Sequence, residues 1–270
     1  MKKTVCVSLI IVAMSVFIGF QHADARTPAK LKVGQDGAQV AFLIGKVQAI
    51  SPGDKNWRFL RLDDVLKRDD EVATGEDSRL ELIMSDGSRV RFAEKTRFIL
   101  QQSDFDIQKK EGRVRFHLSI GRCWANIVRA IKGKSVFELS CNNAVAGVRG
   151  TIYRMNVNED ESALVKVYKG RVEVSKWTGM PSGEPLSSGP PKKVAGPTPI
   201  PGPHKVSMEE WTYIVKSMQQ IRINADGIPE KPEEFDPEED MNEWVRWNQS
   251  RDGVEDVQKD RREESLTGDE

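Results

Sequence analysis

Two cysteines, Cys123 and Cys141, are the residues whose spacing most directly suggests a chemical bond in this 270-residue chain. The third cysteine, Cys6, lies in an N-terminal segment that we expect to be removed. One cysteine pair in an exported protein favours a disulfide, which would stabilise the fold by roughly 3 kcal/mol in the chain-entropy model. Two buried thiols are the alternative, because cysteine is also a good small core residue.

Residues suited to catalysis are few, and none stands at the spacing of a catalytic motif. His117 is expected on the polar face of a strand, as a surface histidine rather than a general base. The carboxylates of Asp63-Asp64 and Asp69-Asp70 are adjacent in the chain, so on a strand each pair would point to opposite faces. Turn formation is the better interpretation of these pairs. We therefore expect no enzyme, with no catalytic residue, cofactor or metal site.

The N-terminus has the three parts of a signal peptide. Lys2 and Lys3 precede an apolar run over residues 5–20, and small residues at positions 23 and 25 form an A-x-A site. We predict a signal peptide over residues 1–25, cleavage between Ala25 and Arg26, and a periplasmic or extracellular protein. An uncleaved membrane anchor is the alternative, although the run is shorter than the ~20 residues that a spanning helix needs.

Charge is distributed unevenly although the whole chain is neutral. Residues 209–270 contain 8 Lys and Arg against 19 Asp and Glu, so the remainder of the chain is basic. The acidic region could fold back on the basic body or bind a basic partner. A solvated region that only keeps the protein soluble is a third interpretation.

Short apolar runs separated by Gly, Asp and Asn predict β-structure over residues 38–177. The clearest period of two is formed by Val114, Phe116, Leu118 and Ile120. Asp86-Gly87 indicates a β-hairpin, for which a type I′ turn is expected. This pattern favours an all-β main domain, which could be a sandwich, a barrel or a solenoid-like stack of short strands.

A different pattern follows the predicted β domain. Residues 178–206 are rich in Pro and Gly and read as a linker, and residues 251–270 as a charged disordered tail. Between them, residues 207–250 are predicted to be a helical segment, because Ser207 and Glu210 fit a capping box. Apolar residues at helical spacing in this segment are candidates for an interaction face: Trp211, Ile214, Met218 and Ile221. A second helix is expected to start at Asp236, which Pro237 follows, and Trp244 is the interaction candidate on it.

Residues 137–151, FELSCNNAVAGVRGT, resemble the most specific motif of the FecR domain. The matching V-R-G-T consists of Val148, Arg149, Gly150 and Thr151. Upstream, Asp86, Gly87 and Ser88 resemble the D-G-S hairpin of the same family, and residues 165–174 resemble its closing strand pair. The ordered set is similar to the family over residues 38–177. Arg149 at the turn is interpreted as a fold-stabilising residue, with ligand binding as the alternative.

The resemblance implies a β-rich extracytoplasmic module that binds other proteins. Family members that relay signals to sigma factors have a cytoplasmic region before their hydrophobic segment, and this sequence shows none. The leading hypothesis is therefore an exported, non-enzymatic interaction or envelope-signalling module with unidentified envelope partners and no nucleic acid. A membrane-anchored signalling regulator is one alternative, with membrane contact only if the N-terminal segment is uncleaved. A glycan-binding or glycan-processing envelope protein is another. It would need a groove with paired carboxylates or an aromatic platform, and clustering of Trp57, Trp124 and Trp177 on one exposed surface would indicate the latter. The oligomeric state is open.

Overall fold

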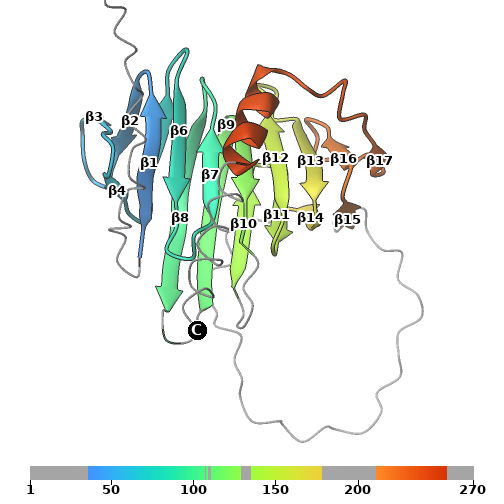
Figure 1. Cartoon of the computed structure of the whole chain (residues 1–270), viewed down its shortest axis with the longest axis horizontal. Helices are drawn as coiled ribbons and strands as arrows, with labels where there is room; N and C mark the ends of the chain where they lie inside the picture. Colours follow the sequence, from blue (N-terminus) through green and yellow to red (C-terminus); the bar gives the residue numbers. More distant parts are fainter. Residues whose placement is uncertain (1–35, 107, 109–110, 129–134, 178–210, 254–270) are drawn as a thin grey trace, which may run out of the picture. The chain divides into compact units, whose positions relative to one another are not determined.

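The computed structural model describes residues 36–106, 108, 111–128, 135–177 and 211–253 (Figure 1). All of these residues belong to one compact unit. The predicted signal peptide, its cleavage site at Ala25 and Arg26, and the predicted linker lie outside the described residues. Among the residues described, no helix is long and apolar enough to cross a membrane.

In the described part of the chain, seventeen strands form two sheets that share one strand. Sheet A has the order β3-β2-β5-β8-β9-β10-β11-β14-β15. Its strands are β2 (Val47–Ile50), β3 (Arg58–Phe59), β5 (Glu71–Thr74), β8 (Arg97–Asp106), β9 (Glu111–Asn126), β10 (Val136–Ser140), β11 (Ala144–Val148), β14 (Arg171–Lys176) and β15 (Thr212–Lys216).

Sheet B has the order β4-β1-β6-β7-β9-β12-β13-β16-β17. Its other strands are β1 (Ala38–Ile44), β4 (Val65–Leu66), β6 (Arg79–Ile83), β7 (Arg89–Phe92), β12 (Ile152–Val157), β13 (Ala163–Lys169), β16 (Gln219–Ile223) and β17 (Glu233–Glu234). The prediction of an all-β main domain followed by a helix is confirmed, and the architecture is a β-sandwich.

The long strand β9 joins the two sheets. Its first part pairs with β8 and, in parallel, with β10 in sheet A, and its last part pairs with β7 and β12 in sheet B. The change of sheet occurs at Gly121, which has a φ of +106°. A Cβ atom there would lie 2.6 Å from the Cα of Thr96, so the strand can pass this neighbour only without a side chain.

Apolar side chains of both sheets fill the space between them. Val114, Phe116 and Leu118 are buried as the period-2 pattern predicts. Phe92 from sheet B stacks on Phe98 from sheet A with ring centroids 3.6 Å apart. The alternating polar residues face outward, so strand periodicity rather than any single residue determines which side of each sheet is core.

The predicted helix starting at Ser207 is wrong for every residue of it that the structure describes. Thr212–Lys216 is β15 and Gln219–Ile223 is β16, with Met218 at a φ of +63° in the turn between them. Of the supposed helical face, Ile214 is exposed while Ile221 is fully buried. Trp211, Tyr213 and Val215 alternate toward the core instead, because the segment extends both sheets. Residues 212–223 are therefore part of the sandwich and not of a separate helical region.

One helix is described in the C-terminal region, over residues 243–253. Asn242 caps it by accepting a 3.0 Å hydrogen bond from the Val245 N–H on its side-chain oxygen. The start expected at Asp236 is wrong, since residues 237–240 form a turn. The predicted disordered tail begins too early as well, because residues 251–253 complete this helix and Asp252 is buried.

The predicted disulfide between Cys123 and Cys141 is not formed: both are free, buried thiols. Cys123 lies in the sheet-B part of β9, opposite Met155, whereas Cys141 follows the last residue of β10 in sheet A. The strand β10 ends at Ser140, opposite His117 of β9. His117 precedes the point at which β9 crosses to sheet B, whereas Cys123 follows it. Burial raises the pKa of both thiols, which act as core residues.

The hairpin predicted at Asp86-Gly87 is confirmed, but its turn is not type I′. Gly87 has a φ of +85°, whereas Asp86 does not have a positive φ. The Gly87 N–H donates to the Met84 carbonyl at 2.9 Å, and the Met84 N–H donates to the Ser88 carbonyl at 2.9 Å. These bonds define the three-residue hairpin loop, in which a type I turn is followed by a left-handed glycine.

Candidate functional site

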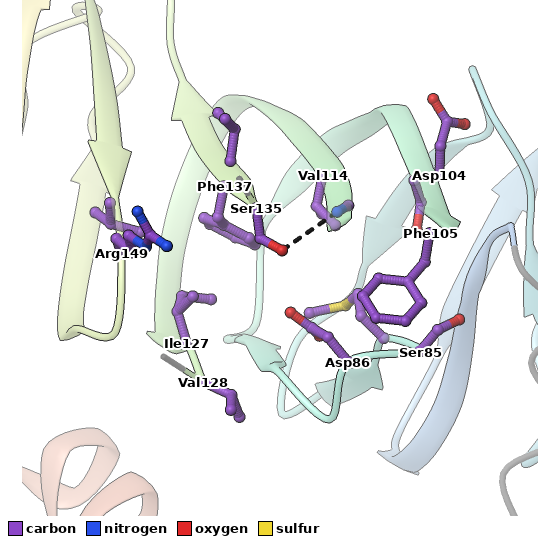
Figure 2. Close-up of a pocket in the computed structure, with 15 residues that line it drawn as sticks. Ser85, Asp86, Asp104, Phe105, Val114, Ile127, Val128, Ser135, Phe137 and Arg149 are labelled. Atoms are coloured by element: carbon purple, nitrogen blue, oxygen red, sulfur yellow. Dashed lines mark hydrogen bonds between the residues drawn. The ribbon is translucent and has the colours of Figure 1, made fainter. Parts of the chain in front are cut away.

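A small pocket opens between the two sheets at one end of the sandwich (Figure 2). Sheet B contributes the β6–β7 turn and the end of β9, and sheet A contributes the end of β8 and the starts of β9 and β10. The cavity is about 20 Å³, which is room for about one water molecule. The residues that line its apolar interior include Met84, Val114, Ile127, Phe137 and Val148.

Asp86 reaches the pocket because its turn is held by its own side chain. Its carboxylate accepts hydrogen bonds from the Ser88 N–H at 2.8 Å and the Ser88 hydroxyl at 2.9 Å. Ser88 in turn accepts a 3.1 Å bond from the Val128 N–H on its hydroxyl oxygen. The D-G-S motif therefore shapes the turn and ties it to the end of β9.

Arg149 lies on the opposite side of the same pocket, between β11 and β12 (Figure 2). It is exposed, while the next residues anchor the chain: Thr151 is buried and its hydroxyl donates to the Arg171 carbonyl at 3.0 Å. Gly150 has a φ of +66°. The turn thus places Arg149 at the pocket and fixes the chain beside it, while fold stabilisation and ligand binding both stay predictions for this residue.

The pocket mouth offers both apolar and charged contacts. Val128 is 46% exposed and Val136 is 39% exposed, although both are large apolar residues. Asp104 is exposed beside Phe105, and Ser135 accepts a 3.2 Å hydrogen bond from the Gly112 N–H (Figure 2). The cavity is too small to enclose a bulky small molecule. The mixed apolar and polar surface around its opening is typical of a contact with a protein partner.

A second candidate region is the outer face of sheet B, which the C-terminal segment, residues 235–253, covers. Asp252 of the helix accepts hydrogen bonds from Arg91 at 2.5 Å and from the Trp124 indole at 3.0 Å. Glu81 accepts hydrogen bonds from Arg91 at 2.5 Å, from Arg89 at 2.9 Å and from Arg251 of the helix at 2.9 Å. Arg91 and Glu81 are completely buried, so this cluster is an internal charge network.

A second charge cluster lies over β12 and β13. Asp240 of the C-terminal segment pairs with Arg154 and accepts hydrogen bonds from Lys166 at 2.8 Å and from the Tyr168 hydroxyl at 2.5 Å. The described part of the acidic C-terminal region therefore does contact the basic body, which was one of the interpretations of the charge distribution. In this second cluster both basic side chains, Arg154 and Lys166, come from the outer face of sheet B.

The pKa values of these buried groups follow from their partners. Burial by itself would raise the pKa of Glu81, but the hydrogen bond from Arg251 and the charges of Arg91 and Arg251 lower it from 4.5 to about 2. Burial would lower the pKa of Arg91, and the charges of Glu81 and Asp252 raise it. Both groups stay ionised at neutral pH, so the network persists as ion pairs.

Trp244 and its neighbours complete the contact between helix and sheet. Trp244 is buried with Val245 against Trp124 and Ala93, so this interaction candidate is used within the chain. Trp247 stacks on Trp244 at 5.3 Å between ring centroids. A groove of about 510 Å³ remains beside them, but its two arginines already pair with carboxylates, Arg79 with Glu243 and Arg122 with Glu94.

The remaining sequence candidates do not assemble into a site. Trp124 is 1% exposed, Trp57 contacts Arg97, and Trp177 contacts His117, so the three tryptophans do not form the shared exposed platform that a glycan binder would need. His117 lies 3.1 Å from the Ser140 hydroxyl. Ser140 is buried and its hydroxyl donates to the Phe116 carbonyl, so this pair is not presented to a substrate.

The two turns at the pocket fall inside one family match. Residues 70–173 match the model of the family described as FecR protein. The resemblance drawn from the V-R-G-T and D-G-S motifs is thereby confirmed for the FecR-matching segment, which runs from the start of β5 into β14. Strands β1–β4, β15–β17 and the helix lie outside it.

Comparison with solved structures finds a distant similarity. Two crystal structures of a candidate anti-sigma factor from Parabacteroides distasonis ATCC 8503 are similar at 17% identity, with TM-scores of 0.39 and 0.40. Each alignment covers 62% of this chain and 60% of the other. This chain therefore spans less than two thirds of the proteins in those structures. No curated protein matches it.

Sequence reasoning missed both charge clusters at residue level. Asp240 lies in the segment predicted to be helical and Asp252 in the predicted tail, and their partners are scattered over β7, β9, β12 and β13. One signal was present: Arg89 and Arg91 alternate with buried apolar residues, which places two arginines on the same outer face. A basic stripe on the outer face of the sheet and an acidic C-terminal region are compatible with a contact between the two, but they do not specify which residues pair.

Proposed function

We propose that this chain is an exported, non-enzymatic module of the FecR type that binds a protein partner in the cell envelope through the pocket end of the sandwich. The observation that carries this proposal is the meeting of Asp86 and Arg149 at one pocket. They belong to separate motifs of the FecR-matching segment, far apart in the sequence. Motif residues that meet at a pocket opening lined by exposed apolar side chains indicate an interaction surface rather than a structural core.

Export is part of the proposal and is supported by the N-terminal pattern of Lys2 and Lys3, an apolar run and the A-x-A site. The mature N-terminus tests it directly. Edman sequencing or intact mass of the protein from the periplasm or culture medium should give Arg26 as the first residue. A protein that retains Met1 in the membrane fraction would support the anchored alternative instead.

Photo-crosslinking in cells tests the binding surface. A photoreactive amino acid replaces Val136 at the mouth, and Glu173 on the outer face of β14 is the matched control position. We expect a discrete crosslinked envelope protein from position 136 and none from position 173. Adding Arg149→Ala should reduce the yield at least several-fold, while circular dichroism shows that the variant remains folded. Equal crosslinking from both positions, or a yield independent of Arg149, would contradict the proposal.

A further inference from the structure

The strand β15 is an open sheet edge that differs from the other edges of the sandwich. Sheet A ends at β3 and β15, and sheet B ends at β4 and β17. The strands β3, β4 and β17 are two residues long, whereas β15, Thr212–Lys216, is five residues long. Natural sheets shorten or block their edges because unpaired backbone groups accept further strands. Three edges here follow that rule and β15 does not.

The direction of the backbone groups in β15 follows from its pairing with β14. The Lys176 N–H donates to the Trp211 carbonyl, and Trp211 lies directly before the strand. Alternate residues, Tyr213 and Val215, therefore also bond to β14. Thr212, Ile214 and Lys216 direct their N–H and C=O groups away from it. Among the described residues, β14 is the one strand that pairs with β15.

The side chains on this edge are suited to a contact. Ile214 is 47% exposed, at the centre of the strand, between the exposed residues Thr212 and Lys216. One outward donor is already used, because the Lys216 N–H donates to the Gln219 side-chain oxygen at 3.1 Å. The backbone groups of Ile214 and Thr212 have no such internal acceptor or donor in the described part of the chain.

We propose that β15 pairs antiparallel with β15 of a second copy of this chain, with the two Ile214 residues opposite each other. In this register the two Ile214 residues exchange N–H···O=C bonds, and Thr212 faces Lys216 of the second copy. The pairing is self-complementary: an exposed apolar residue meets its own copy, and no like charges are placed opposite each other. The edges of two A sheets would join into one continuous sheet.

The area of the contact sets its strength. One five-residue strand pair is much smaller than the ~1,200–2,000 Å² of a standard stable interface. We therefore expect a weak dimer, with a Kd of about 10 µM to 1 mM. The surface is separate from the pocket, and the dimer requires only the purified chain. A failure of this inference would consequently leave the proposed partner-binding function untouched.

Sedimentation equilibrium of the purified protein over a wide concentration range is the test. Wild type should show reversible dimer formation. Ile214→Pro should remain monomeric over the same range, since it removes the outward N–H without affecting a bond to β14. Ile214→Thr is the matched control: it keeps the N–H and a β-branched side chain, so it should dimerise with an affinity only several-fold lower.

Circular dichroism and the melting temperature establish that each variant is folded. If Ile214→Pro does not fold, Thr212→Pro blocks the same edge at another outward N–H. The register is tested by Ile214→Cys, which should form a disulfide-linked dimer on mild oxidation, whereas Glu173→Cys on the outer face of β14 should not. A monomeric wild type at all concentrations, an equally strong dimer in the proline variants, or no crosslink at residue 214 would overturn the proposal.

Discussion

At the scale of single residues, buried charges determine where the C-terminal segment contacts the sandwich. Arg91 is fully buried, and its guanidinium is satisfied by Glu81 from the same sheet and Asp252 from the helix. An unpaired buried charge is costly, whereas a fully paired one is tolerated. The network therefore specifies one position of the helix on sheet B more strictly than apolar contact alone would.

Asp252→Ala is expected to lower the free energy of unfolding by about 3–5 kcal/mol, because it removes one of the two carboxylates that pair with the buried Arg91 and also removes the acceptor of the Trp124 indole. Glu243→Ala on the same helix is the matched control. Its side chain is 82% exposed, so loss of its pair with Arg79 should cost less than about 1 kcal/mol. Denaturant unfolding measures both. Similar losses in the two variants would contradict a special role for the buried network.

The same network makes stability depend on acidity. Glu81 has a pKa of about 2 in the fold against 4.5 as its ordinary value, so its ionised form is favoured by folding. That stabilisation is complete above pH 4.5 and is lost as the pH falls toward 2, and its size is roughly 3 kcal/mol. Glu81→Gln should flatten the acid limb of a melting-temperature profile between these pH values. An unchanged acid limb would show that other carboxylates dominate it.

At the scale of elements, the crossing of β9 from sheet A to sheet B organises the sandwich. The crossing needs a residue that tolerates a φ of +106° in direct contact with Thr96, and Gly121 meets both requirements. On either side of this point, β9 pairs with different strands. The two halves of the sandwich therefore depend on one backbone position.

Gly121→Ala is expected to destabilise the fold by about 2–5 kcal/mol, because a positive φ and an overlap with the Thr96 backbone act together. Gly53→Ala separates the two causes. Gly53 also has a positive φ, +85°, but no atom lies within 4 Å of the position that an alanine Cβ would take, so only about 1 kcal/mol should be lost. Thermal unfolding of both variants is the measurement. Equal losses would mean that the contact with Thr96 is relieved without cost.

At the scale of the whole molecule, the C-terminal segment and the sandwich are one folded unit. Trp244 and the charge clusters contact sheet B, and a buried tryptophan alone contributes roughly 5 kcal/mol gross. The FecR-matching segment ends at residue 173, before the C-terminal segment, so it is not the complete unit here.

Deleting residues 235–270 should lower the melting temperature and increase binding of a hydrophobic dye, because Trp124 and Ala93 lose their cover. A chain that ends after residue 253 keeps both charge clusters and should melt close to wild type. Calorimetry and dye fluorescence on the two truncated proteins make the comparison. An unchanged melting temperature in the longer deletion would show that the segment adds nothing to the stability of the sandwich.

The sequence by itself determined the β class, the D-G-S hairpin and the family resemblance, because period-2 burial and turn residues act over a few neighbouring positions. Charge composition left contact with the basic body as one of three interpretations of the acidic region. Local patterns failed at residues 211–223, where Trp211, Ile214, Met218 and Ile221 fit a helical period while a β-hairpin is formed. The free edges of β13 and β14 decided that outcome, since pairing with them buries Val215 and Ile221.

Only the tertiary structure decided which distant residues meet. Cys123 and Cys141 are close in sequence, yet Cys123 lies in sheet B, after β9 has crossed, and Cys141 lies directly after β10 of sheet A. Conversely, Asp86 meets Arg149 at the pocket, and Arg91 meets Asp252 under the helix. Such contacts depend on strand order and register, which arise from the packing of both sheets around one core. The residue pattern along a single segment does not specify that packing.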